Sequence, residues 1–447
     1  MEDLMAQVTV DFNSVIGQFK LMNAVNNGPV KPRADQSRGN FEEFQVLRIP
    51  LARVHDANLC YAYGGPHCVD IHAIFPDFNA DENDPASYDF HLTDEYLANM
   101  RAAGTQVYYR LGASIEHWSK KYGTLPPADF DKWTRICEHV IMHYNEKWAD
   151  GYEWNIEYWE IWNEPDLDPD DSPHKRCWGG TKAQFFELYK TAATGLKKRF
   201  PNLKIGGPAL AWMVEWGEDF IRYVAENAIP LDFFSWHVYA NTPEKIGELC
   251  TMWRNVLDKN GLTNCESILN EWNYVRNWDS EWLYSLEQMA GLKGAAFTAA
   301  TMCVCQNSPL DLLMYYDARV GCAMNCIFDI TTLKRRKGFY AFYTFAELVE
   351  LGKQTTCSCD EAGLYALAGR DENGNKAILI VSYNDDDNAG IRPLTINTGL
   401  KNHTFDCRMV NQDLSFEPVW PKLSEDGSSL TLPMQRNAIL WITARPC

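Results

Sequence analysis

The sequence has 447 residues, of which 46% are hydrophobic and 13% aromatic, and this composition is sufficient for a large buried core. Such a length exceeds a typical single domain, although an α/β barrel of ~250 residues or more forms one unit. The formal net charge of −19 argues against nucleic-acid binding, because a nucleic-acid-binding protein needs a basic stripe that displaces counterions.

Residues 1–7 contain no positively charged segment followed by an apolar one, so the sequence shows no secretory signal. No apolar run approaches the ~20 residues that a membrane span requires. Fourteen cysteines in a large chain without such a signal indicate reduced, mostly buried thiols rather than a disulfide framework. We therefore expect a cytoplasmic protein that does not bind membranes.

Apolar runs alternate with longer amphipathic segments through most of the chain. We predict strands at 7–20, 44–54, 105–111, 158–164, 204–208, 232–239, 267–271 and 310–316. The predicted helices lie at 93–103, 128–148, 181–200, 216–227, 243–260, 285–306 and 337–351. Strands that alternate with helices indicate a parallel sheet, and eight such strands predict an α/β fold of the TIM (β/α)8 barrel type.

From about residue 354 the pattern changes to short alternating runs separated by turn signals, such as Asn373-Gly374. These runs predict an antiparallel β-sandwich whose expected role is to support the barrel. The predicted domains are therefore a barrel at 1–352, with an insertion at 57–89 after the second strand, and a C-terminal β-sandwich at 353–447.

One strand runs directly into Asn163-Glu164-Pro165, beside two tryptophans. Pro165 cannot donate to a strand ladder and restricts the residue before it, so we expect the strand to end at Glu164. In a parallel barrel, the carboxyl ends of the strands form the face that carries catalytic groups. Aromatic neighbours desolvate a carboxylate and raise its pKa, which suits a general acid.

A second strand, at 267–271, also ends in a carboxylate, that of Glu271. Two carboxylates at strand ends, surrounded by aromatic residues, are what the cleavage of a glycosidic bond requires. One of them protonates the leaving oxygen, and the other attacks the sugar or activates water.

The Trp-Asn-Glu-Pro sequence at 162–165, followed by a later strand that ends in Glu271, resembles the clan A glycoside hydrolases, which are retaining enzymes on a TIM barrel. The wider pattern most resembles glycoside hydrolase family 39, the β-xylosidase and α-L-iduronidase family. This resemblance implies that Glu164 is the acid/base and Glu271 the nucleophile. Trp272, which follows Glu271, is also similar to a feature of the arabinofuranosidases of the clan, and we include it among the sugar-binding candidates.

His237 and Tyr239 lie two residues apart in the predicted sixth strand, so both side chains can face one side. The resemblance implies that His237 contacts the region of the acid/base and that Tyr239 donates a hydrogen bond to the nucleophile. It also implies that Asn163 binds the sugar 2-hydroxyl.

Arg53 and His55 match the Arg-x-His sequence that family 39 often shows at the end of its second strand, where the pair lines the sugar pocket. A buried ion pair that closes the barrel is a compatible role for Arg53. The family commonly places a tryptophan on the eighth strand, whereas this chain has Tyr316 and Asp317. We expect Tyr316 to stack on the sugar and Asp317 to bind a hydroxyl group.

Loops as long as the insertion at 57–89 are usually functional, so we predict a substrate-binding lip over the pocket. Asp70 and His72 are two residues apart and would point to the same side of an extended segment. A metal site built from His67, Asp70 and His72 would have no firm fourth ligand, so we assign no metal. Gly206-Gly207-Pro208 lacks the Lys-Ser/Thr of a phosphate loop, and no cofactor is implied.

The sequence thus predicts a retaining exo-glycosidase, β-xylosidase-like, that acts on an oligosaccharide or glycoside. One alternative is an endo-glycosidase or transglycosidase of the same clan, which surface tryptophans along an open cleft would support. Another is a barrel that binds sugar without cleaving it. An isomerase or lyase acting on a phosphorylated sugar would need a Gly-rich, basic loop after the last two strands, and the sequence has none there. Members of the family often associate through their barrels, so the resemblance is compatible with a homo-oligomer.

Overall fold

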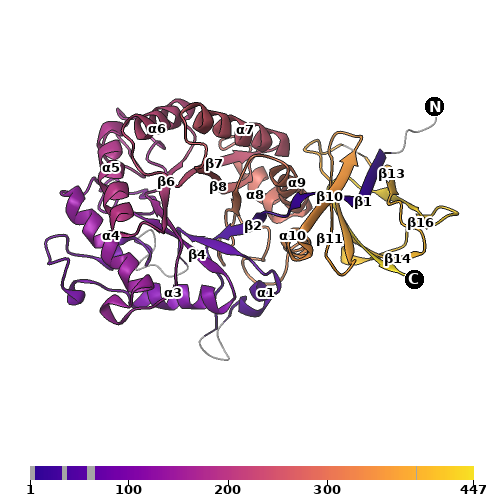
Figure 1. The fold of residues 1–447 in the computed structure, drawn as a ribbon, viewed down its shortest axis with the longest axis horizontal. Coiled ribbons are helices and arrows are strands. Elements are labelled where there is room, and N and C mark those ends of the chain that lie inside the picture. The colour runs from indigo at the N-terminus through magenta and orange to yellow at the C-terminus, as the bar shows by residue number, and fades with distance from the viewer. Residues whose placement is uncertain (1–5, 33–37, 58–65, 389) are drawn as a thin grey trace.

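The computed structural model describes residues 6–32, 38–57, 66–388 and 390–447. A closed barrel of parallel strands lies beside a second unit that consists of one β-sheet (Figure 1). In order around the barrel, the strands are β2 (Leu21–Asn26), β3 (Leu51–Val54), β4 (Gln106–Leu111), β5 (Tyr158–Ile161), β6 (Lys204–Leu210), β7 (Phe233–Ala240), β8 (Glu266–Tyr274) and β9 (Leu312–Tyr315). The TIM barrel predicted from the sequence is confirmed.

Helices surround the barrel and connect its strands (Figure 1). They are α1 (Phe41–Val46), α2 (Ile71–Ile74), α3 (His91–Ala102), α4 (Phe130–Asn145), α5 (Lys182–Arg199), α6 (Val214–Glu226), α7 (Pro243–Lys259), α8 (Trp282–Ala290), α9 (Leu292–Gln306) and α10 (Phe339–Leu351), with the short 3-10 turns η1 (Pro85–Ser87) and η2 (Trp148–Asp150). Thr181 and Gln184 form a capping box that fixes the start of α5. The single helix predicted at 285–306 is instead two helices, which meet at Gly291.

The first predicted strand, 7–20, is not part of the barrel. Instead β1 (Ala6–Gln18) pairs with β10 (Lys353–Cys359) and β13 (Arg392–Asn397) of the second unit, where its indigo ribbon lies among orange and yellow strands (Figure 1). The first half of β1 alternates buried and exposed residues, whereas the next strand, β2, is buried almost throughout. Strict alternation is typical of a sheet with one solvated face, and continuous burial is typical of a parallel barrel strand.

The predicted second strand, 44–54, is also only partly correct. Residues Phe41–Val46 form the helix α1, and the strand β3 begins at Leu51. Phe41 and Phe44 are the buried residues of α1, and their separation of three positions fits one face of a helix.

The second unit is a single, mostly antiparallel sheet of ten strands. Its remaining strands are β11 (Leu364–Arg370), β12 (Lys376–Ser382), β14 (His403–Val410), β15 (Ser415–Val419), β16 (Lys422–Leu423), β17 (Ser429–Met434) and β18 (Ala438–Pro446). Val8 of β1, Leu440 of β18 and Leu432 of β17 belong to one core cluster, so the sheet folds around its own core as a sandwich does.

The other face of this sheet packs against the barrel. Leu379 and Trp441 belong to the same core cluster as the barrel residues, and α9 and α10 contact β11 and β12. Arg276 and Lys293 of the barrel form ion pairs with Asp385, at 2.9 and 3.3 Å. The sheet therefore supports the side of the barrel that α9 and α10 form.

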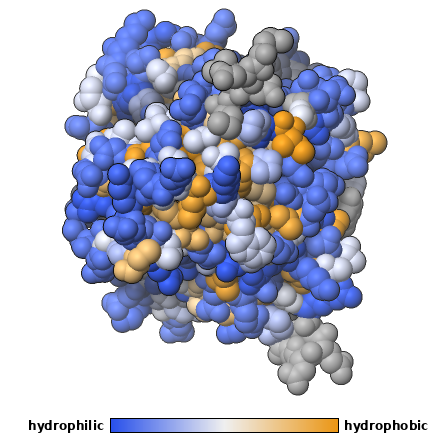
Figure 2. Space-filling model, turned by 90° about the vertical axis from the view of Figure 1, so that its right-hand side faces the viewer, coloured by the Kyte–Doolittle hydropathy of each residue, from blue (hydrophilic) through white to orange (hydrophobic). Residues whose placement is uncertain are grey.

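The end of the molecule that the sheet forms is mainly hydrophilic, with hydrophobic residues interspersed near the middle of the view (Figure 2). None of the helices in the described ranges combines the length and the apolar character that a membrane span requires.

Candidate functional site

Glu164 lies just beyond the end of β5, on a backbone with unusual conformation. The strand ends at Ile161, three residues earlier than predicted, and both Trp162 and Glu164 have positive φ angles, of 76° and 48°. The Trp162 N–H still donates to Leu111 O, and the Glu164 N–H donates to Ala209 O, at 2.7 and 2.9 Å. Non-glycine residues at positive φ are strained, and such strain clusters at functional sites.

The Glu164 carboxyl group contacts a histidine and a thiol. His237 Nδ1 lies 2.9 Å from Oε1, and the thiol of Cys177 lies 3.7 Å from Oε2. Burial raises the pKa of Glu164 to about 7, although the Arg53 charge and the Cys177 thiol partly offset this. Burial also lowers the pKa of His237, so this ring is neutral near pH 7.

The Glu271 carboxylate lies on β8 and receives two donors. The Tyr239 hydroxyl donates to Oε1 at 2.7 Å, and the Arg53 guanidinium donates to Oε2 at 3.3 Å. Burial raises the pKa of Glu271 to about 7, and the neighbouring His237, Arg53 and Tyr239 act in the opposite direction.

The two carboxyl groups face each other across a short gap. One oxygen of Glu164, one oxygen of Glu271 and a ring nitrogen of His237 all lie within 4.8 Å of one another. Two carboxyl groups this close cannot both ionise easily, so the pair retains one proton near neutral pH. Arg53 and Tyr239 both donate hydrogen bonds to Glu271 and stabilise its ionised form. The same three groups are also close enough to share a metal ion, so a chelator control belongs in any assay.

Arg53 lies fully buried beneath this pair rather than on the pocket wall. Its guanidinium donates to Glu160 Oε2 at 2.7 Å, to Glu271 as described, and to Asn163 Oδ1 at 2.6 Å. Burial alone would lower the pKa of Arg53, but Glu160 and Glu271 outweigh it, and the pKa is raised. Asn163 is buried as well. Arg53 therefore links the residue before the acid/base candidate to the nucleophile candidate.

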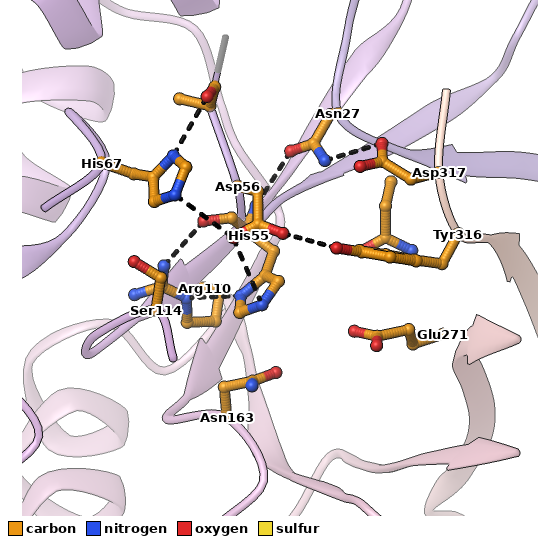
Figure 3. A network of polar contacts seen from close by, with 12 residues as sticks. Asn27, His55, Asp56, His67, Arg110, Ser114, Asn163, Glu271, Tyr316 and Asp317 are labelled. Atoms are coloured by element: carbon orange, nitrogen blue, oxygen red, sulfur yellow. Dashed lines mark hydrogen bonds and ion pairs between the residues drawn. The ribbon is translucent and has the colours of Figure 1, made fainter. Parts of the chain in front are cut away.

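A cavity of about 930 Å³ opens at the carboxyl ends of the strands, above the carboxyl pair. Of the residues predicted from the sequence, it is lined by Glu164, Glu271, His55, His237, Tyr239 and Tyr316. Figure 3 shows the side chains of His55, Asn163, Glu271 and Tyr316 around one open space. Residues from the ends of five strands, β3, β5, β7, β8 and β9, thus converge on one chamber.

Asp70 and His72 do not line this cavity, and the expectation that both point to one side of an extended segment is wrong. Asp70 directly precedes the short helix α2 without a side-chain capping bond, and its carboxylate binds Arg110 Nη2 and Ser114 Oγ, both at 2.6 Å. His72 lies on α2 and lines a separate, more apolar hollow. No residue between 66 and 89 is among those lining the cavity above the carboxyl pair, and 58–65, the rest of the predicted lip, lie outside the described residues.

Trp272 and Asp317 are also absent from the cavity wall. Trp272 points outward from the barrel, between Phe297 and Tyr315. Asp317 is buried, accepts a hydrogen bond from Asn27 at 2.9 Å and pairs with Arg319 at 3.2 Å. Neither side chain lines this cavity, so the predictions that Trp272 and Asp317 bind the sugar there are wrong.

Asp56, which directly follows His55, is a further residue of the cavity wall that was not predicted from the sequence. Asp56 lines the cavity and accepts a hydrogen bond from the Tyr316 hydroxyl at 2.7 Å (Figure 3). It also lies 3.7 Å from Arg319. Burial opposes ionisation, but His55, Arg319 and His67 hold the pKa of Asp56 well below its usual range. A permanent negative charge therefore lies in the wall beside the carboxyl pair.

Four tryptophans also line the cavity and were not selected from the sequence, one of which is the buried Trp253 of α7. Trp212 follows β6, and Trp278 and Trp282 follow β8. Trp212 and Trp278 are 62% and 52% exposed, which places them at the mouth of the cavity. Trp278 stacks on Trp282 and meets the Tyr239 ring edge-on, with ring centroids 4.8 and 4.9 Å apart.

Part of this chain is similar in sequence to a curated β-xylosidase. The chain is 31% identical over 172 residues to a β-xylosidase of Geobacillus stearothermophilus, which is 35% of this chain and 30% of that relative. The chain therefore matches less than a third of the length of this curated relative.

Solved structures share the fold over the full chain. A glucosidase from Croceicoccus marinus has a TM-score of 0.78 at 23% identity and is covered over its whole length, as is this chain. A monomeric β-xylosidase from Caulobacter crescentus CB15 has a TM-score of 0.72 at 15% identity, with 98% of this chain and 99% of that one covered.

The sequence model of glycosyl hydrolases family 39 matches residues 52–307, which is more than half of the chain. The matched segment runs from β3 to the end of α9 and includes both Glu164 and Glu271. This chain belongs to glycosyl hydrolases family 39.

Proposed function

We propose that the chain is a retaining exo-glycosidase, β-xylosidase-like, with Glu164 as acid/base and Glu271 as nucleophile. The observation that carries this proposal is the carboxyl pair, whose facing oxygens lie within 4.8 Å of each other. Retaining enzymes hold the two carboxyl groups about 5–5.5 Å apart, whereas inverting enzymes need about 6.5–9.5 Å to admit a water molecule.

The reaction has two steps. In the first, an oxygen of the ionised Glu271 bonds to the anomeric carbon, the bond to the leaving oxygen breaks, and that oxygen takes the proton of Glu164. In the second, the Glu164 carboxylate removes a proton from water, the water oxygen bonds to the anomeric carbon, and Glu271 is released as a carboxylate. Tyr239 and Arg53 favour the ionised Glu271 that the first step requires, and burial favours the protonated Glu164.

The exo mode is supported by the closed wall on one side of the cavity. Tyr316 and Asp56 are hydrogen-bonded to each other (Figure 3). Asp56 also lies 3.7 Å from Arg319 and 3.5 Å from His67. A sugar bound beside this wall has little room for a further residue at its non-reducing end. The xylosidase preference rests on the family and on the name of the curated relative, and the glucosidase among the structural neighbours makes a glucoside the first competitor.

The test is a panel of aryl glycosides at pH 6, including β-xyloside, β-glucoside and α-L-arabinofuranoside, with wild type and the Glu271→Gln variant. We expect one glycoside to be cleaved and the variant to lose several orders of magnitude in kcat. The anomer first released, followed by NMR, should have the configuration of the substrate. Release of the opposite anomer would contradict the retaining mechanism, and loss of activity with a chelator would contradict a metal-free site.

An endo-glycosidase or transglycosidase is the second candidate, because Trp212 and Trp278 lie exposed at the mouth of the cavity. Tryptophan faces there can stack on additional sugar rings. The products of a linear oligosaccharide labelled at one end decide between the two. Release of single sugars from the non-reducing end supports the exo mode, and early release of internal fragments supports the endo mode.

A further inference from the structure

The cavity above Glu164 and Glu271 has two halves of different chemistry. One half is polar and contains His55, Asp56 and Tyr316. The other half is lined mainly by apolar and aromatic side chains, namely Leu210, Val214, Val238, Leu249, Trp253 and Trp278, and the cavity also contains Arg176 and His117. At about 930 Å³ the whole cavity is near the upper end of the ~300–1,000 Å³ range of pockets that enclose drug-sized ligands. It therefore has room for much more than one sugar ring.

The barrel topology places these halves on opposite sides. β3, which precedes His55, and β9, which precedes Tyr316, both pair with β2. Except for Trp278, which follows β8, the apolar half comes from the ends of β6 and β7 and from α6 and α7 that follow them. β6 and β7 lie across the barrel from β2. The polar half, with its charged Asp56, is the side that suits sugar hydroxyl groups.

Glu164 lies on the apolar side of this division. Its backbone N–H donates to Ala209 O of β6, and Leu210 is the next residue. The acid/base protonates the oxygen of the departing group, so that group must lie near Glu164. The geometry therefore directs the leaving group toward the apolar half.

A second sugar would find few hydrogen-bond partners in the apolar half. Its hydroxyl groups would lose water and need new partners, and an unpaired buried hydroxyl is costly. The indole N–H of Trp212 already donates to Leu167 O at 3.2 Å, and the guanidinium of Arg176, at the edge of the cavity, is bound to Asp168 at 2.7 Å. An apolar group gains from burial against the same side chains.

We infer that the preferred substrate carries a large apolar aglycone, such as an alkyl, aryl or terpenoid group, in place of a second sugar. This inference rests on the proposed glycosidase function and names the leaving group of that reaction. The apolar half, defined by Leu210, Val214, Val238, Leu249, Trp253 and Trp278, is then the aglycone site.

The test uses alkyl glycosides of the sugar that the aryl panel selects, from methyl to octyl, below their micelle concentrations, with the matching disaccharide. Butyl, hexyl and octyl alcohols have nearly the same acidity, so differences in kcat/KM among these substrates report aglycone binding and not leaving-group chemistry. Burial predicts a rise of up to about fourfold per methylene. Octyl should exceed both methyl and the disaccharide, whereas equal kcat/KM along the series, or a preference for the disaccharide, would overturn the inference.

Two variants test whether the alkyl chain binds in the apolar half of the cavity. Val214→Asn places an amide in the apolar half and should reduce the ratio of octyl to methyl kcat/KM several-fold. The matched change Leu423→Asn, at an exposed residue of β16 in the second unit, should leave that ratio unchanged. An equal ratio in Val214→Asn and wild type would place the alkyl chain elsewhere and contradict the assigned site.

Binding to Glu271→Gln, measured by calorimetry with the same alkyl series, separates the two proposals. Affinity that rises with chain length, without any turnover by wild type, would contradict the proposed hydrolysis but support the aglycone site. Turnover by wild type with affinity that is flat along the series would support hydrolysis and contradict the aglycone site.

Discussion

The Tyr239 hydroxyl donates a hydrogen bond to Glu271 at 2.7 Å, and the residue two positions before it, His237, contacts Glu164 at 2.9 Å. One strand, β7, therefore positions a partner for each carboxyl group of the pair. Because successive inward side chains of a strand are two residues apart, these two contacts are set together.

Replacing Tyr239 by Phe tests the hydrogen bond to the nucleophile. The hydroxyl stabilises the ionised form of Glu271, so its removal should raise the pKa of Glu271. A hydrogen bond to a charged group contributes about 1.5–3 kcal/mol, which corresponds to a shift of roughly one to two pKa units. We expect the acid limb of the kcat/KM–pH profile to move to higher pH.

The control for this variant is Tyr223→Phe, which removes a tyrosine–glutamate hydrogen bond to Glu187 on the outer helices. It should leave the profile unchanged. An unshifted acid limb in Tyr239→Phe would show that this hydroxyl does not set the ionisation of the nucleophile.

Cys177 offers a test of the acid/base. Its thiol lies 3.7 Å from Glu164 Oε2 and lowers the pKa of that carboxyl, against the larger effect of burial. In Cys177→Ala the pKa of Glu164 should rise, so the alkaline limb of the profile should move upward by a fraction of a pH unit. Cys177→Ser, which retains a donor, should stay nearer to wild type.

Cys137→Ala is the matched control, because Cys137 is a buried free cysteine on α4 that does not line the cavity. A shift of the alkaline limb in both Ala variants would indicate a general effect on the fold. A shift in neither would remove Cys177 from the set of groups that tune Glu164.

The two-residue alternation of side chains along a strand explains how much of the site could be predicted from the sequence. Parallel strand ends meet on one face of a barrel, so Glu164, His237 and Glu271 could be brought together from their positions at or near strand ends. The same period explains one error, because Trp272 follows the inward-facing Glu271 and must point outward. Asp56 and Trp278 lie beyond the strands, where no period indicates the direction of a side chain.

The fold, too, could be predicted from the sequence only in part. The eight-strand barrel follows from the alternation of strands and helices, but the prediction that 7–20 belongs to the barrel is wrong. The alternation of Val8, Thr9 and Val10 already indicated a sheet with one exposed face. Its partner β10 is more than 300 residues away, and local pattern carries no information on such a pairing.

The position of β1 is testable by two neighbouring substitutions. Val8 is fully buried in the core of the ten-stranded sheet, and Thr9 points to solvent. Val8→Asp should lower the stability of the protein by about 3–5 kcal/mol, because it buries an unpaired charge, and Thr9→Asp should have an effect within about 0.5 kcal/mol. Urea unfolding followed by fluorescence measures both. In a barrel strand with both faces buried, the two variants would be similarly destabilised, and that result would contradict the observed pairing.

The carboxyl pair should also cost the protein stability at high pH. Burial raises the pKa of Glu164 to about 7, above the value of about 4.3 for a free glutamate, so the folded protein binds a proton more tightly than the unfolded chain. Stability from this group is therefore fully present below about pH 4 and is lost as the pH rises to 7 and beyond.

Glu164→Gln, which cannot ionise, should be more stable than wild type by about 1–3 kcal/mol at pH 8, with little difference at pH 4.5. Thermal unfolding at the two pH values measures this, and Glu226→Gln, at an exposed position on α6, should show no such pH-dependent gain. An equal difference between Glu164→Gln and wild type at both pH values would mean that the stability gain does not come from ionisation of this carboxyl group.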